Sequence, residues 1–107
     1  MDRINHPLPP GRVPELLLST PRTIVLRARA EFSDGSGAQE AGLVIPRQDC
    51  QGERPSAEAL RNAAWMCATR LGRCGGAVRR LYRLLVRVEG RWVPLLELPR
   101  GALALPA

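Results

Sequence analysis

The chain has 107 residues, of which 45% are hydrophobic and 24% charged, a size and composition that fit one globular domain and leave no room for a second. No apolar run approaches a membrane span and the N-terminus shows no signal peptide, so we expect a cytoplasmic protein. Three cysteines, an odd count without a secretion signal, predict free thiols rather than a disulfide framework.

The formal net charge of +6 is unevenly distributed along the chain, and all sixteen cationic residues are arginines. Residues 1–53 hold six arginines and seven acids, whereas residues 54–107 hold ten arginines and three acids. All of the excess charge therefore lies in the second half. Guanidinium groups form paired hydrogen bonds with phosphates and carboxylates, which predicts a partner that carries such groups.

Residues 1–21 contain His6 and five prolines with little periodicity, which indicates an extended arm. From Thr23 to Phe32 apolar and polar residues alternate, so this segment is predicted to be a half-buried strand. A loop follows, and alternation resumes from Gln39 to Ile45 before Pro46. The two segments predict a β-hairpin, with a polar connection over residues 46–55.

A helix is predicted from about residue 57 to 73, with Ser56 as its N-cap and Glu58 in its first turn. Apolar residues recur at helical spacing along it, and Gly75-Gly76 would end it. The buried stripe is expected to contain Leu60, Ala64, Cys67, Leu71 and Cys74.

Residues 77–88 fit two patterns about equally. As a helix they present an apolar stripe of Val78, Leu81, Tyr82, Leu85 and Val88. As a strand from Tyr82 they turn Tyr82, Leu84, Val86 and Val88 inward. The clustered valines favour the strand, and Glu89-Gly90 resembles a hairpin turn into a last strand over residues 92–98. Pro94 would place that strand at a sheet edge.

Together these elements predict an α+β domain of order ββαββ over residues 22–99, with one helix packed on an antiparallel sheet. The extended Pro-rich arm precedes it, and residues 100–107 form a C-terminal tail.

Catalytic or metal chemistry has little support in the sequence. His6 is the single histidine, and Cys50 is a loop thiol with only Arg47 and Arg54 as nearby cations. A zinc site would require His6 to converge with Cys50, Cys67 and Cys74, which lack the close pairing typical of zinc modules. We therefore expect no enzyme, no metal, no cofactor and no small-molecule substrate.

The segment Leu71-Gly72-Arg73-Cys74-Gly75, followed by Val78 and Leu81, resembles the GxxG loop of KH domains over about eleven residues. The resemblance implies a glycine-flanked turn between two helices that approaches single-stranded nucleic acid, and it requires a helix over residues 77–85. Phe32, Tyr82 and Trp92 have the inward parity of their strands, unlike the outward aromatics of an RNA-recognition sheet.

The sheet face opposite the helix is instead expected to display arginines among apolar residues, namely Arg27, Arg29, Arg83, Arg87 and Arg91 with Val25, Val44, Leu85, Val93 and Leu95. This mixture is typical of protein interfaces as well as nucleic-acid surfaces, and it also fits a merely solvated face. The predicted binding residues are Arg27, Arg29, Arg73, Arg79, Arg80, Arg83, Arg87 and Arg91.

The first functional hypothesis is a basic binding protein that engages nucleic acid or a nucleoprotein surface through this arginine-rich face. The alternative is an interaction protein, an inhibitor or adaptor from a phage or other mobile element, that docks on an acidic protein surface or homodimerises. In size and strand–helix order the chain resembles small phage inhibitors such as anti-CRISPR proteins, without a shared motif.

Overall fold

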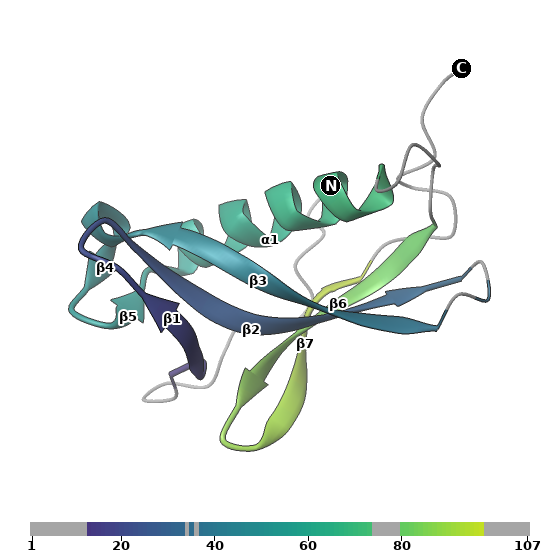
Figure 1. Ribbon diagram of the computed structural model, residues 1–107, viewed down its shortest axis with the longest axis horizontal. Helices are drawn as coiled ribbons and strands as arrows, with labels where there is room; N and C mark the ends of the chain where they lie inside the picture. Colours follow the sequence, from purple (N-terminus) through teal and green to yellow (C-terminus); the bar gives the residue numbers. More distant parts are fainter. Residues whose placement is uncertain (1–12, 34, 36, 74–79, 98–107) are drawn as a thin grey trace.

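The structure, a computed structural model of the chain, describes residues 13–33, 35, 37–73 and 80–97 (Figure 1). It is an α+β fold in which helix α1 (Ala57–Gly72) lies on an antiparallel sheet, as the sequence predicts, but the sheet has five strands instead of the predicted four. The sheet contains β1 (Leu16–Ser19), β2 (Thr23–Phe32), β3 (Ala38–Pro46), β6 (Leu81–Val88) and β7 (Arg91–Glu97). The connection from β3 to α1 holds a 3-10 helix η1 (Arg47–Asp49) and a small hairpin of β4 (Cys50–Gln51) and β5 (Arg54–Pro55).

Strand β2 is the centre of the sheet. β3 pairs along one edge of β2, from Thr23↔Pro46 to Glu31↔Ala38. The other edge is shared, because β1 pairs with its first half and β6 with its second half. β7 then pairs with β6 alone, so it is an edge strand among the described residues, as Pro94 predicts.

β1 is a strand of the sheet, whereas the sequence analysis counted residues 16–19 in the arm. Glu15 anchors it: its amide donates to the Arg87 carbonyl at 2.8 Å, and its carbonyl accepts from the Arg27 amide at 3.2 Å. Its carboxylate also accepts from the Gly90 amide at 2.5 Å. Glu15 thus closes the junction at which β1, β2 and β6 meet.

The core lies between α1 and one face of the sheet. One face of the alternating strand β2 is buried, and it consists of Ile24, Leu26, Ala28, Ala30 and Phe32. Leu43 and Ile45 of β3 are fully buried as well. On α1 the predicted stripe of Leu60, Ala64, Cys67 and Leu71 is buried against them. Cys74 lies outside the described residues.

Helix α1 begins and ends close to the predicted positions. Ser56 is the N-cap, and its hydroxyl accepts a hydrogen bond from the Ala59 amide at 3.1 Å. Glu58 lies in the first turn and Arg70 in the last, where their charges suit the helix dipole.

Residues 81–88 form strand β6, so the helical alternative for this segment is wrong. The KH resemblance loses its second helix as a consequence. Gly72 is the last residue of α1, and residues 74–79 lie outside the described part of the chain.

The predicted side-chain direction is wrong for four residues of the β6–β7 hairpin, namely Tyr82, Trp92, Val93 and Leu95. A register shift at Glu31/Phe32 places Leu81, 1% exposed, opposite Phe32, and it leaves Tyr82 exposed. The two-residue turn Glu89-Gly90 pairs Val88 with Arg91, which puts Trp92 opposite Arg87 on the outer face. Val93 and Leu95, predicted to face outward, pack with the core instead.

Candidate functional site

The outer face of the sheet, opposite α1, carries the predicted arginines, and each of the four on β2 and β6 has a carboxylate neighbour. Arg27 Nε lies 4.0 Å from Glu40 Oε1, and Arg29 Nε lies 3.4 Å from Glu31 Oε2. Arg83 donates to Glu31 Oε1 from Nε at 2.8 Å and from Nη2 at 2.7 Å.

Arg87, the fourth of these arginines, lies 3.8 Å from Glu15 Oε2 and stacks over the Trp92 ring, 5.1 Å from its centroid. Glu97 of β7 is directly opposite Arg83. The four arginines therefore form ion pairs with three glutamates, because Glu31 serves both Arg29 and Arg83. With Glu97 as the fourth carboxylate, the formal charge of these eight residues sums to zero. A balanced face lacks the positive potential that attracts nucleic acid over a distance.

The other predicted binding residues do not join this cluster. Arg73 caps the C-terminus of α1, Arg80 precedes β6 and Arg91 lies at the β6–β7 turn; all three are exposed. Arg79 lies outside the described residues. Within the described part of the chain, the arginines without an ion pair are Arg22, Arg54, Arg61, Arg70, Arg73, Arg80 and Arg91.

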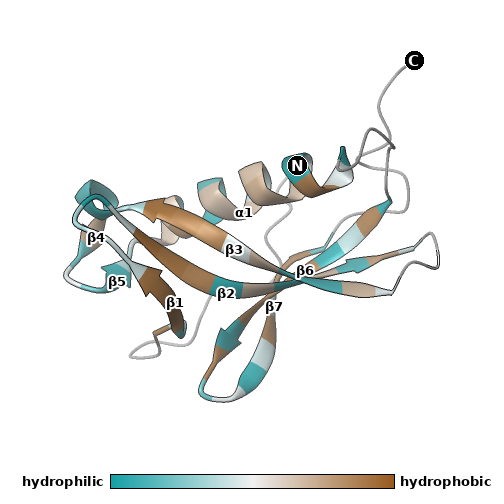
Figure 2. Cartoon of the chain, viewed as in Figure 1, coloured by the Kyte–Doolittle hydropathy of each residue, from teal (hydrophilic) through white to brown (hydrophobic). Residues whose placement is uncertain are grey.

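An apolar stripe crosses the outer face beside the charged cluster. Val25 of β2 is paired with Leu18 of β1 on one side and with Val44 of β3 on the other. Leu18 is 59% exposed and Val44 49% exposed. Figure 2 shows hydrophobic residues along β1 and at the adjoining parts of β2 and β3. Val25, Leu18 and Val44 therefore form adjoining apolar positions on three neighbouring strands.

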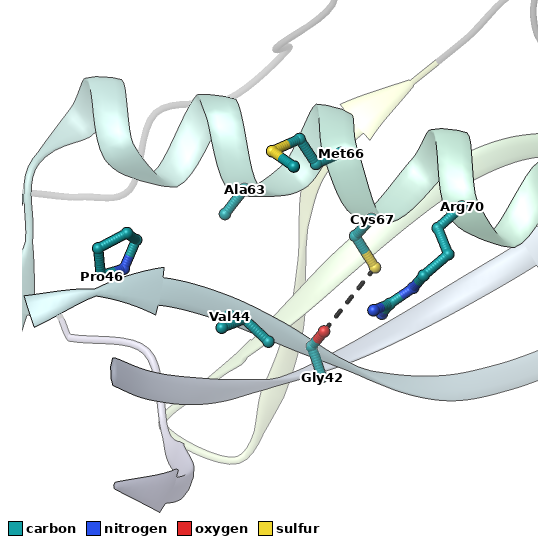
Figure 3. A pocket seen from close by; sticks show the side chains of 7 residues that line it. All are labelled: Gly42, Val44, Pro46, Ala63, Met66, Cys67 and Arg70. Atoms are coloured by element: carbon teal, nitrogen blue, oxygen red, sulfur yellow. Dashed lines mark hydrogen bonds between the residues drawn. The ribbon is translucent and has the colours of Figure 1, made fainter. Parts of the chain in front are cut away.

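The stripe continues around the edge of the sheet into a groove between β3 and α1, with a volume of about 380 Å³. Its walls are Gly42, Val44 and Pro46 from β3 and Ala63, Met66, Cys67 and Arg70 from α1 (Figure 3). The helical residues follow the spacing i, i+3, i+4 and i+7, so they form one flank of α1. Met66 is 71% exposed and stands at the rim.

The backbone of β3 is open where it borders this groove. The Arg27 amide bonds to Glu15, away from β3, so the opposed pair Arg27↔Gly42 exchanges no hydrogen bonds. By alternation, the amides of Glu40, Gly42 and Val44 all face the free edge. No strand pairs with this edge among the described residues.

Cys67 and Arg70 form the floor and one end of the groove. The Cys67 Sγ atom donates to the Gly42 carbonyl at 4.0 Å, and Figure 3 shows Arg70 reaching toward β3 beside it. Burial raises the pKa of the Cys67 thiol, and the Arg70 guanidinium offsets part of that rise. The thiol is therefore neutral near pH 7, and the charge at this end of the groove is that of Arg70.

The sequence analysis placed Cys67 in the buried stripe of the helix and did not predict the groove. Ala63, Met66, Cys67 and Arg70 share one flank by spacing, but nothing in the sequence indicates which strand lies beside that flank. The helical spacing of Ala63, Met66, Cys67 and Arg70 was the available signal, and it identifies the flank but not the groove.

No group of three or more His, Cys, Asp or Glu side chains able to hold a metal ion occurs in the described residues. Cys50 is partly buried, with its pKa raised by desolvation, and its thiol donates to the Pro46 carbonyl at 3.5 Å. His6 and Cys74 lie outside the described residues. In the described part of the chain, no helix combines the length and the apolar character needed to cross a bilayer.

No protein family matches the chain, and neither a curated protein nor a solved structure matches it.

Proposed function

We propose that the protein is a small non-enzymatic binding protein that docks on a protein partner, in the manner of an inhibitor or adaptor. One observation carries the proposal: a continuous apolar surface runs from Leu18 and Val25 over Val44 into the β3/α1 groove. Exposed apolar surface of this kind becomes favourable when a protein partner covers it. The phosphate groups of a nucleic acid have no apolar atoms that could cover this surface.

The charges indicate the chemistry of the partner. α1 carries Arg61 and Arg70, with Arg73 at its C-cap, against one acid, Glu58. Of these, Arg70 lines the groove, and the groove lining contains no acidic residue among those the structure describes. The groove is therefore basic as well as apolar, which favours a partner surface with apolar and acidic residues.

A second candidate is nucleic-acid binding, which the arginines without an ion pair favour. In this candidate the contacts come from Arg73, Arg80 and Arg91 rather than from the balanced sheet face. Such binding weakens steeply as salt rises, whereas an apolar interface persists. Excess absorbance of the purified protein at 260 nm would support this candidate over the first.

Site-specific photo-crosslinking tests the proposed function. A photoreactive amino acid replaces Met66 in the full chain, and a matched control replaces Trp65, which is 43% exposed. At 3.6 residues per turn Trp65 lies about 160° around the helix axis from Ala63, on the other flank. We expect one defined, protease-sensitive adduct in the native cell at position 66 and none at 65. A nuclease-sensitive adduct, or equal adducts at both positions, would contradict the proposal.

A further inference from the structure

We propose that the β3/α1 groove binds an extended peptide segment of the partner, which adds as a strand to the free edge of β3 and places an acidic group against Arg70. This inference rests on the proposed function and specifies the form of its ligand. The chemistry that recognises the segment is backbone hydrogen bonding along β3, apolar contact along the groove and one charge pair at its end.

The edge of β3 supplies the backbone partners. The amides of Gly42 and Val44 face the groove, and the carbonyls of the same residues face the same way. The Gly42 carbonyl accepts only a long thiol hydrogen bond, which leaves a lone pair for an incoming amide. Pro46, which has no amide hydrogen, sets one end of the pairing stretch.

The groove walls supply the side-chain contacts. Alternate residues of an added strand point toward α1, where Ala63 and Met66 present apolar surface. The volume of about 380 Å³ lies within the range of sites that hold small ligands, about 300 to 1,000 Å³. The exposed Met66 side chain can adjust to different apolar residues.

The positive charge of Arg70 favours an acidic peptide segment over a second copy of this chain as the ligand of the groove. Arg70 is exposed and has no ion pair among the described residues, so a carboxylate of the segment can pair with it. Two copies joined through their β3 edges around a two-fold axis near Gly42 would bring their Arg70 side chains together. Repulsion between those arginines, and between chains of net charge +6, disfavours that pairing.

The test selects a phage-displayed library of random linear dodecapeptides on the full chain and measures the affinity of the best synthetic peptide. The key variant is Val44→Pro, which removes an edge-facing amide without removing a β2–β3 hydrogen bond. Val44→Thr keeps the amide and is its control. Arg70→Glu tests the charge, and Arg61→Glu, on the far flank of α1, is its control.

We expect enriched peptides with apolar residues at alternate positions and an acidic residue near one end. Val44→Pro and Arg70→Glu should each weaken binding about tenfold or more, which corresponds to about 1.4 kcal/mol. Arg61→Glu should bind normally, and Val44→Thr, which keeps the amide but loses apolar contact, should lose less affinity than Val44→Pro. Bound peptide should also slow amide exchange at Gly42 and Val44. The exchange measurement uses the wild-type chain, so it tests strand addition even if Val44→Pro does not fold.

Failure to enrich any linear peptide, or equal affinity for Val44→Pro together with unchanged exchange, would overturn strand addition. If the photo-crosslink at position 66 still formed, the proposed function would stand with a folded surface as its ligand. A wild-type chain that dimerises while Val44→Pro stays monomeric would identify a second copy as the occupant. Binding of a labelled oligonucleotide that is lost in Arg70→Glu would identify nucleic acid.

Discussion

The Cys67 thiol lies 4.0 Å from the Gly42 carbonyl oxygen and joins the middle of α1 to the unpaired edge of β3. Both residues line the groove, and their contact lies where β3 and α1 approach each other (Figure 3). Most edge strands are protected by charges, bulges or covering segments. Here the helix stands beside the edge and leaves its amides accessible.

Gly42→Ala should destabilise the protein. A Cβ atom at Gly42 would lie 2.7 Å from Val25 Cγ1, so the Val25 side chain must rotate or the strands must shift, at a cost of about 1 to 3 kcal/mol. Chemical denaturation of Gly42→Ala, Val25→Ala and the double variant should show that the two changes together cost less than their sum. Strictly additive effects would mean that the two residues do not meet.

The thiols should differ in reactivity. Cys67 is 5% exposed and burial raises its pKa, so at pH 8 it is mostly a neutral, inaccessible thiol. A thiol reagent should label Cys50 about a hundredfold faster than Cys67 in the native protein, because Cys67 must wait for local opening. Mass mapping of labelled peptides over time checks this. Equal rates would show that the groove floor is open to solvent.

Leu71→Ala should cost about 2 to 5 kcal/mol of unfolding free energy, since Leu71 is 5% exposed and its truncation leaves a cavity under α1. The measurement is urea denaturation followed by circular dichroism. An unchanged midpoint would mean that α1 presents a different face to the sheet.

Neutralising Arg83, Arg87 and Arg91 together should leave the fold intact. Arg83 and Arg87 each lose a half-buried ion pair at the surface, worth roughly 1 kcal/mol, and Arg91 has none in the described residues. Docking on a protein partner through the groove should not change. A loss of affinity for nucleic acid, with the salt slope lowered by about one unit for the contact of Arg91, would instead support the second candidate.

Much of the fold could be predicted from local pattern. Alternation in β2 identifies its buried residues, and Ser56 with the apolar stripe identifies α1. Local pattern gave wrong side-chain directions where they depend on the register between strands. A bulge beside Phe32 puts Leu81 instead of Tyr82 in the inward position, and the two-residue turn puts Trp92 on the outer face. Parity counted within one strand cannot detect either change.

The candidate site was less predictable, because its ion pairs and its groove depend on contacts between residues of different strands and of the helix. The arginines of the outer face were correctly placed on β2 and β6, but their balance depends on Glu31, Glu15 and Glu97, which approach from several strands. The groove likewise forms only because β3 and α1 lie side by side. The sequence of neither segment indicates that the two are neighbours.

Amide hydrogen exchange along β3, followed by NMR on the free protein, tests the open edge most directly. The account predicts slow exchange at Ala41, Leu43 and Ile45, whose amides bond to β2, and fast exchange at Gly42 and Val44, whose amides face the groove. Protection of Gly42 and Val44 equal to that of Leu43 would contradict it, because the edge would then already be covered.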